Sequence, residues 1–296
     1  ELPGLAAEAI GALPAAERPK TETQSVPWRE GELPKLRGKV GLAADAERAA
    51  VATPEGVVVA PRPNHFAGVG GEVAVHDAKA IRVEAADDTL IAAYLIDPGR
   101  AEYSLDDLSA EQGLELEPEP AAEEETAALV RNAEAARRLA PLLRERVRER
   151  GLEGLYDNVE LPLTAVLAAM EDTGVRIDTY RMGEITARLA DRVEELEART
   201  YELAGEEFGI GSPVQLGRIL FEKLGLTPGR KGKTGYSTDG KVLRAIRADH
   251  EIVPVIEEWR ELTKLVNTYL GPLPTLIGED GRLHTTINQH VAATGR

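Results

Sequence analysis

Carboxylates that could hold metal ions follow the first short β-like runs of the chain. Asp45 and Glu47 come directly after an apolar run, and their i, i+2 spacing on a strand predicts that both face the same side. Asp77 follows a later run of the same kind. Acids grouped in this way can bind divalent cations, and two-metal sites hydrolyse phosphodiesters. With 51 acids in the chain, chance also produces such a pair, and Asp88 is equally expected as a charge at a helix start.

A basic island interrupts an acidic chain. The net charge is -16, which taken globally argues against nucleic-acid binding. Residues 212–247, however, carry eight Lys and Arg against two acids, so this stretch is +6 and the remainder is -22. The uneven distribution is more informative than the total, because a local basic patch is what a nucleic-acid site requires.

The centre of the island is a loop of cations, hydroxyls and glycines. Its candidate phosphate ligands are Lys231, Lys233, Thr234, Ser237 and Thr238, and a helix is expected to begin near Thr238. Phosphate oxygens are bound by such groups and by helix N-termini, without reading the base sequence. The predicted binding is therefore sequence-independent and weakened by salt. A solvated Lys/Gly loop explains the composition equally well.

Composition limits the classes of protein to which the chain can belong. Its 296 residues suffice for about two domains. There is no cysteine, which excludes disulfides and thiolate sites and fits a reducing compartment. No apolar run approaches the roughly 20 residues that span a bilayer, so we expect a cytoplasmic protein without a membrane partner.

The chain is expected to change character after Gly154. Short strands followed by helices predict a small α/β domain, and the long amphipathic patterns that follow predict an all-α region. The predicted organisation is a linker at 1–40, an α/β domain at 41–154, a helical domain at 155–276 and a return to strand at 277–296. Two long helices joined by the basic loop indicate a projecting arm, for which a coiled-coil-like dimerisation arm is the alternative.

Four long segments resemble the bacterial DNA polymerase I family, the family A polymerases. They are YDNVELPLTAVLAAMEDTGVRID (156–178), LAGEEFGIGSPVQLGRILFEKLGL (203–226), WRELTKLVNTYLGPLPTLI (259–277) and GRLHTTINQHVAATGR (281–296). The resemblance implies an α+β multidomain fold. Its parts are a ribonuclease H-like 3′–5′ exonuclease-like domain (41–154), a helical thumb (155–276) and the first strands of a palm (277–296).

The resemblance also implies roles for particular residues. The thumb of the family grips primer–template DNA across the minor groove, and the last Arg of the ATGR motif reaches the primer terminus; here that residue is Arg296. Gln289 lies close to the same DNA in the family. The DNA-binding set implied is Ser212, Lys231, Lys233, Thr234, Ser237, Thr238, Lys264, Gln289 and Arg296.

Departures from the family pattern concern both the binding of DNA and the exonuclease activity. Gly209 and Gly211 stand where Asn residues are usual, and Val266-Asn267 where Lys-Ser is usual. Asp45, Glu47 and Asp77 match the first exonuclease acids, but Ala128 and Asn132 replace the late Tyr and Asp. We therefore expect a vestigial exonuclease domain with no confident metal site. An active 3′–5′ exonuclease is one alternative function, and a non-catalytic helical interaction module is another.

The family's metal-binding palm aspartates lie beyond the ATGR motif. We accordingly expect this chain to be a monomeric piece of a DNA-directed DNA polymerase that binds primer–template DNA without extending it. The remaining palm and fingers are its implied partners, and Mg²⁺ is the cofactor expected only for the full-length enzyme. We expect residues 281–296 to form a strand that lacks most of its pairing partners, and to be the least rigid part of the second half of the chain.

Overall fold

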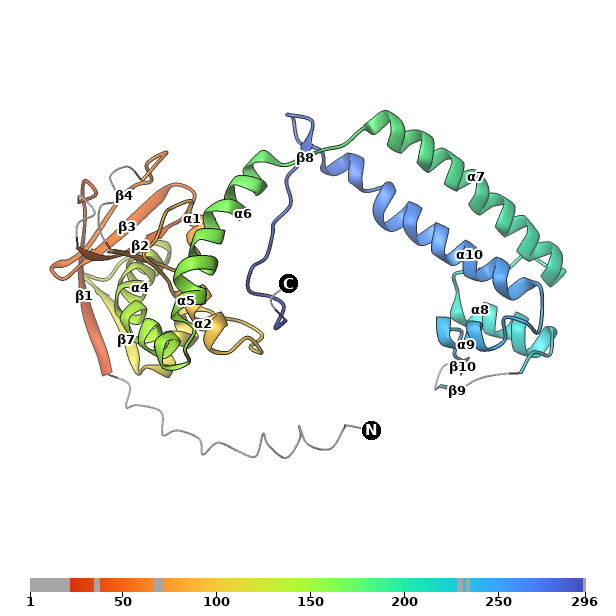
Figure 1. Cartoon of the computed structure of the whole chain (residues 1–296), viewed down its shortest axis with the longest axis horizontal. Helices are drawn as coiled ribbons and strands as arrows, with labels where there is room; N and C mark the ends of the chain where they lie inside the picture. Colours follow the sequence, from red (N-terminus) through yellow and green to blue (C-terminus); the bar gives the residue numbers. More distant parts are fainter. Residues whose placement is uncertain (1–21, 35–37, 67–71, 228–230, 233–234, 295–296) are drawn as a thin grey trace. The chain divides into compact units, whose positions relative to one another are not determined.

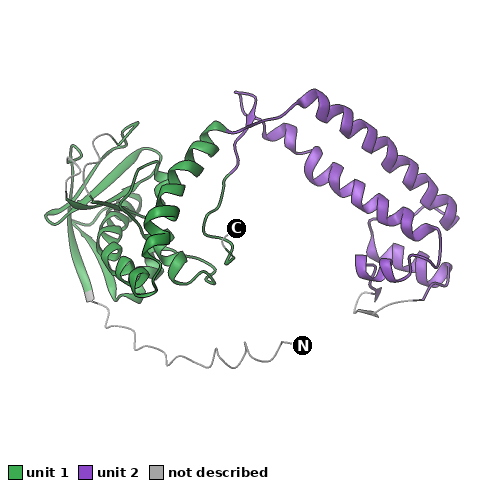
Figure 2. Ribbon diagram, in the orientation of Figure 1, with its two compact units in different colours: residues 1–173, 286–296 green, residues 174–285 purple. Residues whose placement is uncertain are grey.

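The chain folds into two compact units. The computed structural model describes residues 22–34, 38–66, 72–227, 231–232 and 235–294. Unit 1 comprises residues 1–173 and 286–296, and unit 2 comprises residues 174–285 (Figure 2). The division falls after Thr173 and not at residue 155, so the helix at the start of the predicted thumb belongs to unit 1.

A seven-stranded mixed sheet forms the centre of unit 1. Its spatial order is β6-β5-β2-β3-β4-β1-β7. The strands are β1 (Glu22–Glu30), β2 (Lys39–Ala44), β3 (Arg48–Thr53), β4 (Gly56–Pro61), β5 (Glu72–Val75), β6 (Asp87–Asp88) and β7 (Leu114–Glu119). Strands β2, β3 and β4 are antiparallel, whereas β1 is parallel to both β4 and β7. The expectation of a linker over 1–40 is therefore wrong for β1, whose Val26 is buried in the core.

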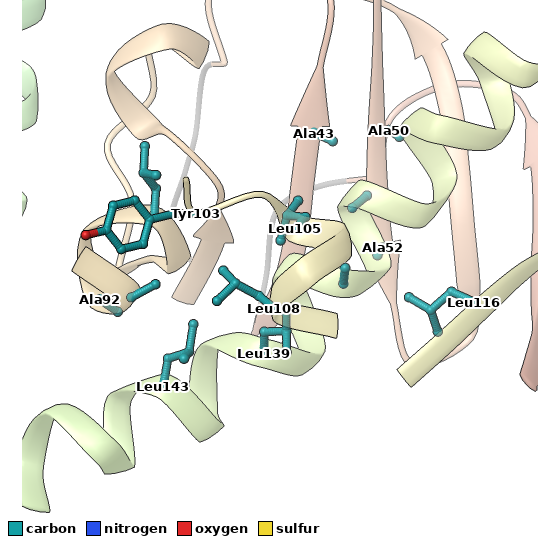
Figure 3. Packing of buried hydrophobic residues seen from close by; sticks show 14 of the residues in the cluster. Ala43, Ala50, Ala52, Ala92, Tyr103, Leu105, Leu108, Leu116, Leu139 and Leu143 are labelled. Carbon is teal, nitrogen blue, oxygen red and sulfur yellow. The ribbon is translucent and has the colours of Figure 1, made fainter. Parts of the chain in front are cut away.

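Helices cover the sheet because its strands are apolar on both faces. The helices of unit 1 are α1 (Ala78–Ile81), α2 (Thr89–Ile96), α3 (Leu105–Glu111), α4 (Glu124–Glu149), α5 (Glu153–Leu155), the π-helix η1 (Tyr156–Glu160) and α6 (Leu161–Thr173). On one face, Ala43, Ala50 and Ala52 pack with Leu139 of α4 and with residues of α2 and α3 (Figure 3). The opposite face buries Leu42 and Val51 in a second cluster with α1.

Small side chains let α4 lie directly on the sheet. A Cβ atom at Gly41 would lie 1.9 Å from the carbonyl oxygen of Ala133, so no larger residue fits between β2 and α4. Side chains cap two of these helices: Ser104 caps α3, and Asp88, expected as a charge at a helix start, caps α2. The sequence thus determines both where these helices start and how closely they approach the sheet.

Unit 2 is a pair of long helices with a cluster of short helices (Figure 1). Its elements are β8 (Val175–Arg176), α7 (Thr179–Ala204), α8 (Pro213–Gly217), the π-helix η2 (Arg218–Lys223), β9 (Lys231–Gly232), β10 (Gly235–Tyr236), α9 (Gly240–Ala245), α10 (Ile252–Lys264), the π-helix η3 (Leu265–Leu270), the 3-10 helix η4 (Leu273–Leu276) and β11 (Arg282–Leu283). The ion pairs Arg192–Glu258 and Arg199–Glu251 show that α7 and α10 run antiparallel.

The short helices of unit 2 close an apolar core against the end of the helix pair. Leu216, Ile219 and Leu220 pack there with Leu243 and with Ile256 of α10, and all five are fully buried or nearly so. This core packs α8, η2 and α9 against α10.

The predicted strand over 281–296 is largely wrong. Among the described residues of this stretch, only Arg282 and Leu283 form a strand, β11, which pairs antiparallel with β8. Residues 284–294 have no strand or helix, and those from 286 onward belong to unit 1. Within the described part of the chain, no helix has the length and apolar character needed to cross a membrane.

Candidate nucleic-acid interface

An open groove in unit 2 lies between α10–η3 and the segment that joins β10 to α9. Its volume is about 810 Å³. The groove is lined by Gly211, Pro213, Gly235, Tyr236, Ser237, Thr238, Asp239, Trp259, Arg260, Thr263, Lys264, Asn267 and Thr268. Three of the predicted DNA-binding residues, Ser237, Thr238 and Lys264, are therefore brought together at one surface.

One face of α10 and η3 supplies the polar wall of this groove. Arg260, Thr263, Lys264, Asn267 and Thr268 all line it. Their spacing of three and four residues places them on the same side of a helix. Lys264 and Asn267 are exposed, so they can contact a ligand without any rearrangement of the helix.

Arg260 is a second cation of the groove, and it was not among the predicted ligands. Its guanidinium donates to the carbonyl oxygen of Thr238 at 2.5 Å and to Thr238 Oγ1 at 3.3 Å. Partial burial lowers the pKa of Arg260 from its usual value. No ion pair joins Arg260 to any carboxylate of the described residues. A half-buried cation without a protein counter-charge favours an anionic ligand.

Two of the predicted phosphate ligands have other roles. Thr238 is buried and accepts hydrogen bonds from the Arg260 guanidinium, so it orients this cation. Ser237 Oγ donates to Asp239 Oδ2 at 2.8 Å. The helix expected to start at Thr238 begins at Gly240, and Asp239 Oδ1 accepts from the backbone N–H groups of Lys241 and Val242. These N-terminal donors are therefore already satisfied.

The basic island is less basic in the structure than in the sequence. Arg218 and Lys223 both pair with Glu206, and Arg247 pairs with Glu257. These three paired cations are not among the residues that line the groove, whereas Lys241 and Arg244 stay exposed. Glu206 and Glu257 lie outside residues 212–247, over which the charge of the island was counted. The net charge of +6 therefore omits the carboxylates that neutralise part of it.

The other predicted ligands are not among the described residues that line the groove. Ser212 caps α8, its Oγ accepting from the backbone N–H of Gln215 at 3.5 Å. Lys231 forms strand β9 with Gly232. Lys233, Thr234 and Arg296 lie outside the described residues. Gln289 belongs to unit 1, where its amide nitrogen donates to the carbonyl oxygen of Glu160 at 2.9 Å and to Glu160 Oε2 at 2.6 Å.

The acids matched to an exonuclease are engaged in local structure. Asp45 and Glu47 lie in the turn between β2 and β3, which corrects the expectation that they share one face of a strand. Asp45 Oδ1 accepts from the backbone N–H groups of Glu47 and Arg48 at 2.8 and 2.6 Å. Burial raises the pKa of Asp45, but these bonds and the Arg48 charge outweigh it and lower the value.

Arg48 supplies the positive charge beside Asp45. Its guanidinium lies 3.6 Å from Asp45 Oδ2 and donates to Thr126 Oγ1 at 2.8 Å, which ties the turn to the start of α4. A guanidinium of the chain itself therefore occupies one side of this carboxylate. The residues that replace the late exonuclease pair, Ala128 and Asn132, lie further along α4.

Asp77 and Asp88 act as helix caps. Asp77 Oδ1 accepts from Ala80 N at 2.9 Å at the start of α1. Asp88 is buried, and burial raises its pKa to about 6 although its carboxylate accepts from the backbone N–H groups of Asp77, Ala78, Leu90 and Ile91. The described residues contain no group of three acids or histidines placed to hold a metal ion.

Comparison with solved structures identifies the general class of this fold. It is similar to a polymerase domain, the POL domain of Pol1 from M. smegmatis, which was solved in complex with DNA primer-template and dNTP. The TM-score is 0.70 at 28% identity, over 87% of this chain and 50% of that chain. Residues 179–296 match the sequence model of DNA polymerase family A. The chain is therefore similar to this family, over these residues in sequence and over most of its length in fold.

The similar curated proteins are DNA polymerases I. The one from Geobacillus stearothermophilus is 40% identical over 71% of this chain, which is 26% of the relative. The thermostable one from Thermus aquaticus is 43% identical over 71% of this chain and 24% of the relative. The chain thus spans about a quarter of the length of these relatives.

Proposed function

We propose that this chain grips primer–template DNA through the groove of unit 2, as the duplex-holding part of a DNA polymerase of the polymerase I type. The observation that carries the proposal is the cationic face of α10, where Arg260 and Lys264 line an open groove together with Asn267 and Thr268. Such a face matches the charge and hydrogen-bonding capacity of a phosphate backbone.

The mechanism of binding follows from which groups are available. Thr238 fixes the Arg260 guanidinium at the base of the groove, so this cation is oriented before a ligand arrives. Lys264 is exposed at the rim and can follow a phosphate that changes position. Because no group of the groove is placed by its partners to read a base pair, the binding would be independent of sequence.

Unit 1 would correspond to the 3′–5′ exonuclease-like domain, with a ribonuclease H-like sheet, and unit 2 to the thumb. We propose that the exonuclease-like domain is vestigial, because Asp45 and Asp77 are satisfied by backbone donors. By the same family relationship, palm and fingers would complete the enzyme, with Mg²⁺ bound by palm aspartates. The complete enzyme would be cytoplasmic and would act in DNA replication and repair.

The test is a titration of labelled primer–template DNA with the purified chain. The proposal predicts binding that weakens steeply with salt and is equal for scrambled sequences. The double variant Arg260→Gln and Lys264→Gln should lower the slope of log affinity against log salt by about 1.8, because each lost phosphate contact contributes about 0.9. Unchanged affinity in this variant would overturn the proposal.

A further inference from the structure

Buried polar atoms without a hydrogen-bond partner gather on α10, beside the groove of unit 2. Among the described residues, three of the four such side-chain atoms lie on this helix: Glu257 Oε2, Trp259 Nε1 and Thr263 Oγ1. Glu257 has a charge partner, because Arg247 Nε lies 3.3 Å from the same oxygen. The other two atoms have no recorded partner within the described part of the chain. Native proteins leave few polar atoms in this condition, so each one requires a physical explanation.

Trp259 and Thr263 lie on one side of α10, and both line the groove. Their spacing of four residues places one side chain above the other on the same helix face. A Cβ atom at Gly211 would lie 3.6 Å from Trp259 Cη2, so the outer edge of the indole ring lies close to this glycine on the opposite wall. The two unpartnered atoms therefore belong to the same surface as Arg260 and Lys264.

The hydrogen-bonding groups at this place favour a ligand that accepts. An indole N–H can only donate, and a threonine hydroxyl can donate or accept. Arg260, which follows Trp259, carries more N–H donors than the two that Thr238 accepts. A cationic ligand would be repelled by this guanidinium. Three donors on one surface therefore match an anionic group with several acceptor oxygens, and a phosphodiester is such a group.

We propose that Trp259 and Thr263 bind one phosphodiester group of the duplex at the base of the groove, together with Arg260. The inference rests on the proposed function and adds to it two uncharged residues, which an account based on charge does not include. Both atoms are buried, so a phosphate reaches them only when neighbouring side chains of the groove move aside. The phosphate then satisfies donors that the fold leaves unpaired, and this gain favours the bound state.

The test measures stability and affinity on the full chain, because this role predicts changes of opposite sign. An unpaired buried polar group destabilises a fold, and an apolar group of the same shape removes that penalty. Thr263→Val should therefore raise the urea midpoint of unfolding without DNA. The same variant should bind primer–template DNA about tenfold more weakly, the loss expected for one hydrogen bond to a charged group. Trp259→Phe keeps an aromatic ring without the N–H and should weaken binding to a similar degree.

Two matched controls make the same substitutions where the polar atom has a partner. Thr200 is fully buried on α7 of the same unit, and its Oγ1 donates to the carbonyl oxygen of Leu196 at 2.7 Å. Thr200→Val should therefore not raise the midpoint and should leave affinity unchanged. Trp28 Nε1 in unit 1 donates to the carbonyl oxygen of Pro120 at 2.5 Å, and Trp28→Phe should also leave affinity unchanged.

Trp28→Phe also leaves Trp259 as the single tryptophan of the chain. Its fluorescence should then change on addition of primer–template DNA, with the same midpoint as binding measured by anisotropy. Absence of this change while DNA is bound would overturn the inference.

The remaining outcomes separate this inference from the proposed function. A lower urea midpoint for Thr263→Val would show that the hydroxyl has a structural partner, such as a buried water, and would overturn the inference. So would affinities unchanged by both Thr263→Val and Trp259→Phe, in which case weaker binding by Arg260→Gln with Lys264→Gln would still support the proposed function. Failure of the wild-type chain to bind any duplex would overturn the proposed function and the phosphate assignment together.

Discussion

Neutralising Lys264 should weaken DNA binding by an amount that depends on salt. Lys264 ends α10, is exposed, and lines the groove beside Asn267 and Thr268. If it faces a phosphate, Lys264→Gln removes one counterion-release contribution, and the slope of log affinity against log salt falls by about 0.9. The same relation gives a loss of roughly eightfold, or about 1.2 kcal/mol, at about 0.1 M salt, vanishing near about 1 M.

Fluorescence anisotropy of labelled primer–template DNA measures this slope if the titration is repeated from about 50 to about 200 mM salt. Lys39→Gln is the matched control, since it makes the same change of charge on β2 of unit 1, where the side chain is 78% exposed. The control should leave the slope unchanged. An equal effect of both substitutions would mean that total charge, and not the groove, controls binding. No effect of Lys264→Gln would refute the assignment of this residue.

Three further predictions concern the fold and the exonuclease acids. Gly41→Ala should destabilise unit 1 by about 3 kcal/mol in urea unfolding, because its Cβ would collide with α4. Gly99→Ala should cost far less, because the nearest atom to its Cβ would be Asp97 Oδ1 at 3.7 Å, an ordinary contact distance. Glu171→Ala should cost about 3 kcal/mol, since it leaves Lys79 nearly buried and unpaired. Because folding lowers the pKa of Glu171, this carboxylate stabilises the fold above the pKa that it has in the unfolded chain, and the stabilisation is lost as the pH falls through its pKa in the folded chain. The free energy of unfolding of the wild-type chain should therefore fall in acid more than that of Glu171→Gln, and an equal fall in both would contradict this. Asp45→Ala should reduce stability by about 1 kcal/mol through the lost turn bonds, and single-stranded DNA with Mg²⁺ or Mn²⁺ should remain intact with either protein; degradation that disappears in Asp45→Ala would show a working nuclease.

Helix boundaries could be predicted because their signals are local. The caps Ser104 and Ser212 and the start of α2 at Asp88 lie within three residues of the groups that they satisfy. Gly174 follows α6, and Gly205 ends α7 with a left-handed backbone that glycine adopts at little cost. None of these features depends on distant parts of the chain.

Strands β1 and β3 escaped prediction because their partners are distant or their side chains are small, and one predicted strand did not form. β1 pairs with β4 and β7, so Glu22 lies opposite Leu114, and no local pattern reveals this. β3 is mostly alanine and valine, a composition that fits a helix equally well. The alternation of polar and apolar residues in 284–294 suggested a strand. The segment is held instead by individual hydrogen bonds with Glu160, Glu171 and Tyr94, which are distant in the sequence and leave no local pattern.

The groove was predictable in location but not in detail. Charge located the loop next to it, and helical spacing would have placed Arg260 and Lys264 on one face. The sequence could not show that Thr238 is buried and holds Arg260, or that Glu206 neutralises Arg218, because both depend on tertiary contacts. The local charge therefore predicts where the groove lies, whereas tertiary packing determines which of its cations are free to bind a ligand.

Amide hydrogen exchange with and without primer–template DNA tests the central claim most directly. The account predicts that DNA slows exchange in residues 235–240 and 260–268, the two walls of the groove, and that Arg260→Gln with Lys264→Gln removes this protection. The turn at residues 45–48 should exchange at the same rate in both conditions. Protection confined to that turn, or no protection in either wall of the groove under conditions where DNA is bound, would contradict the account.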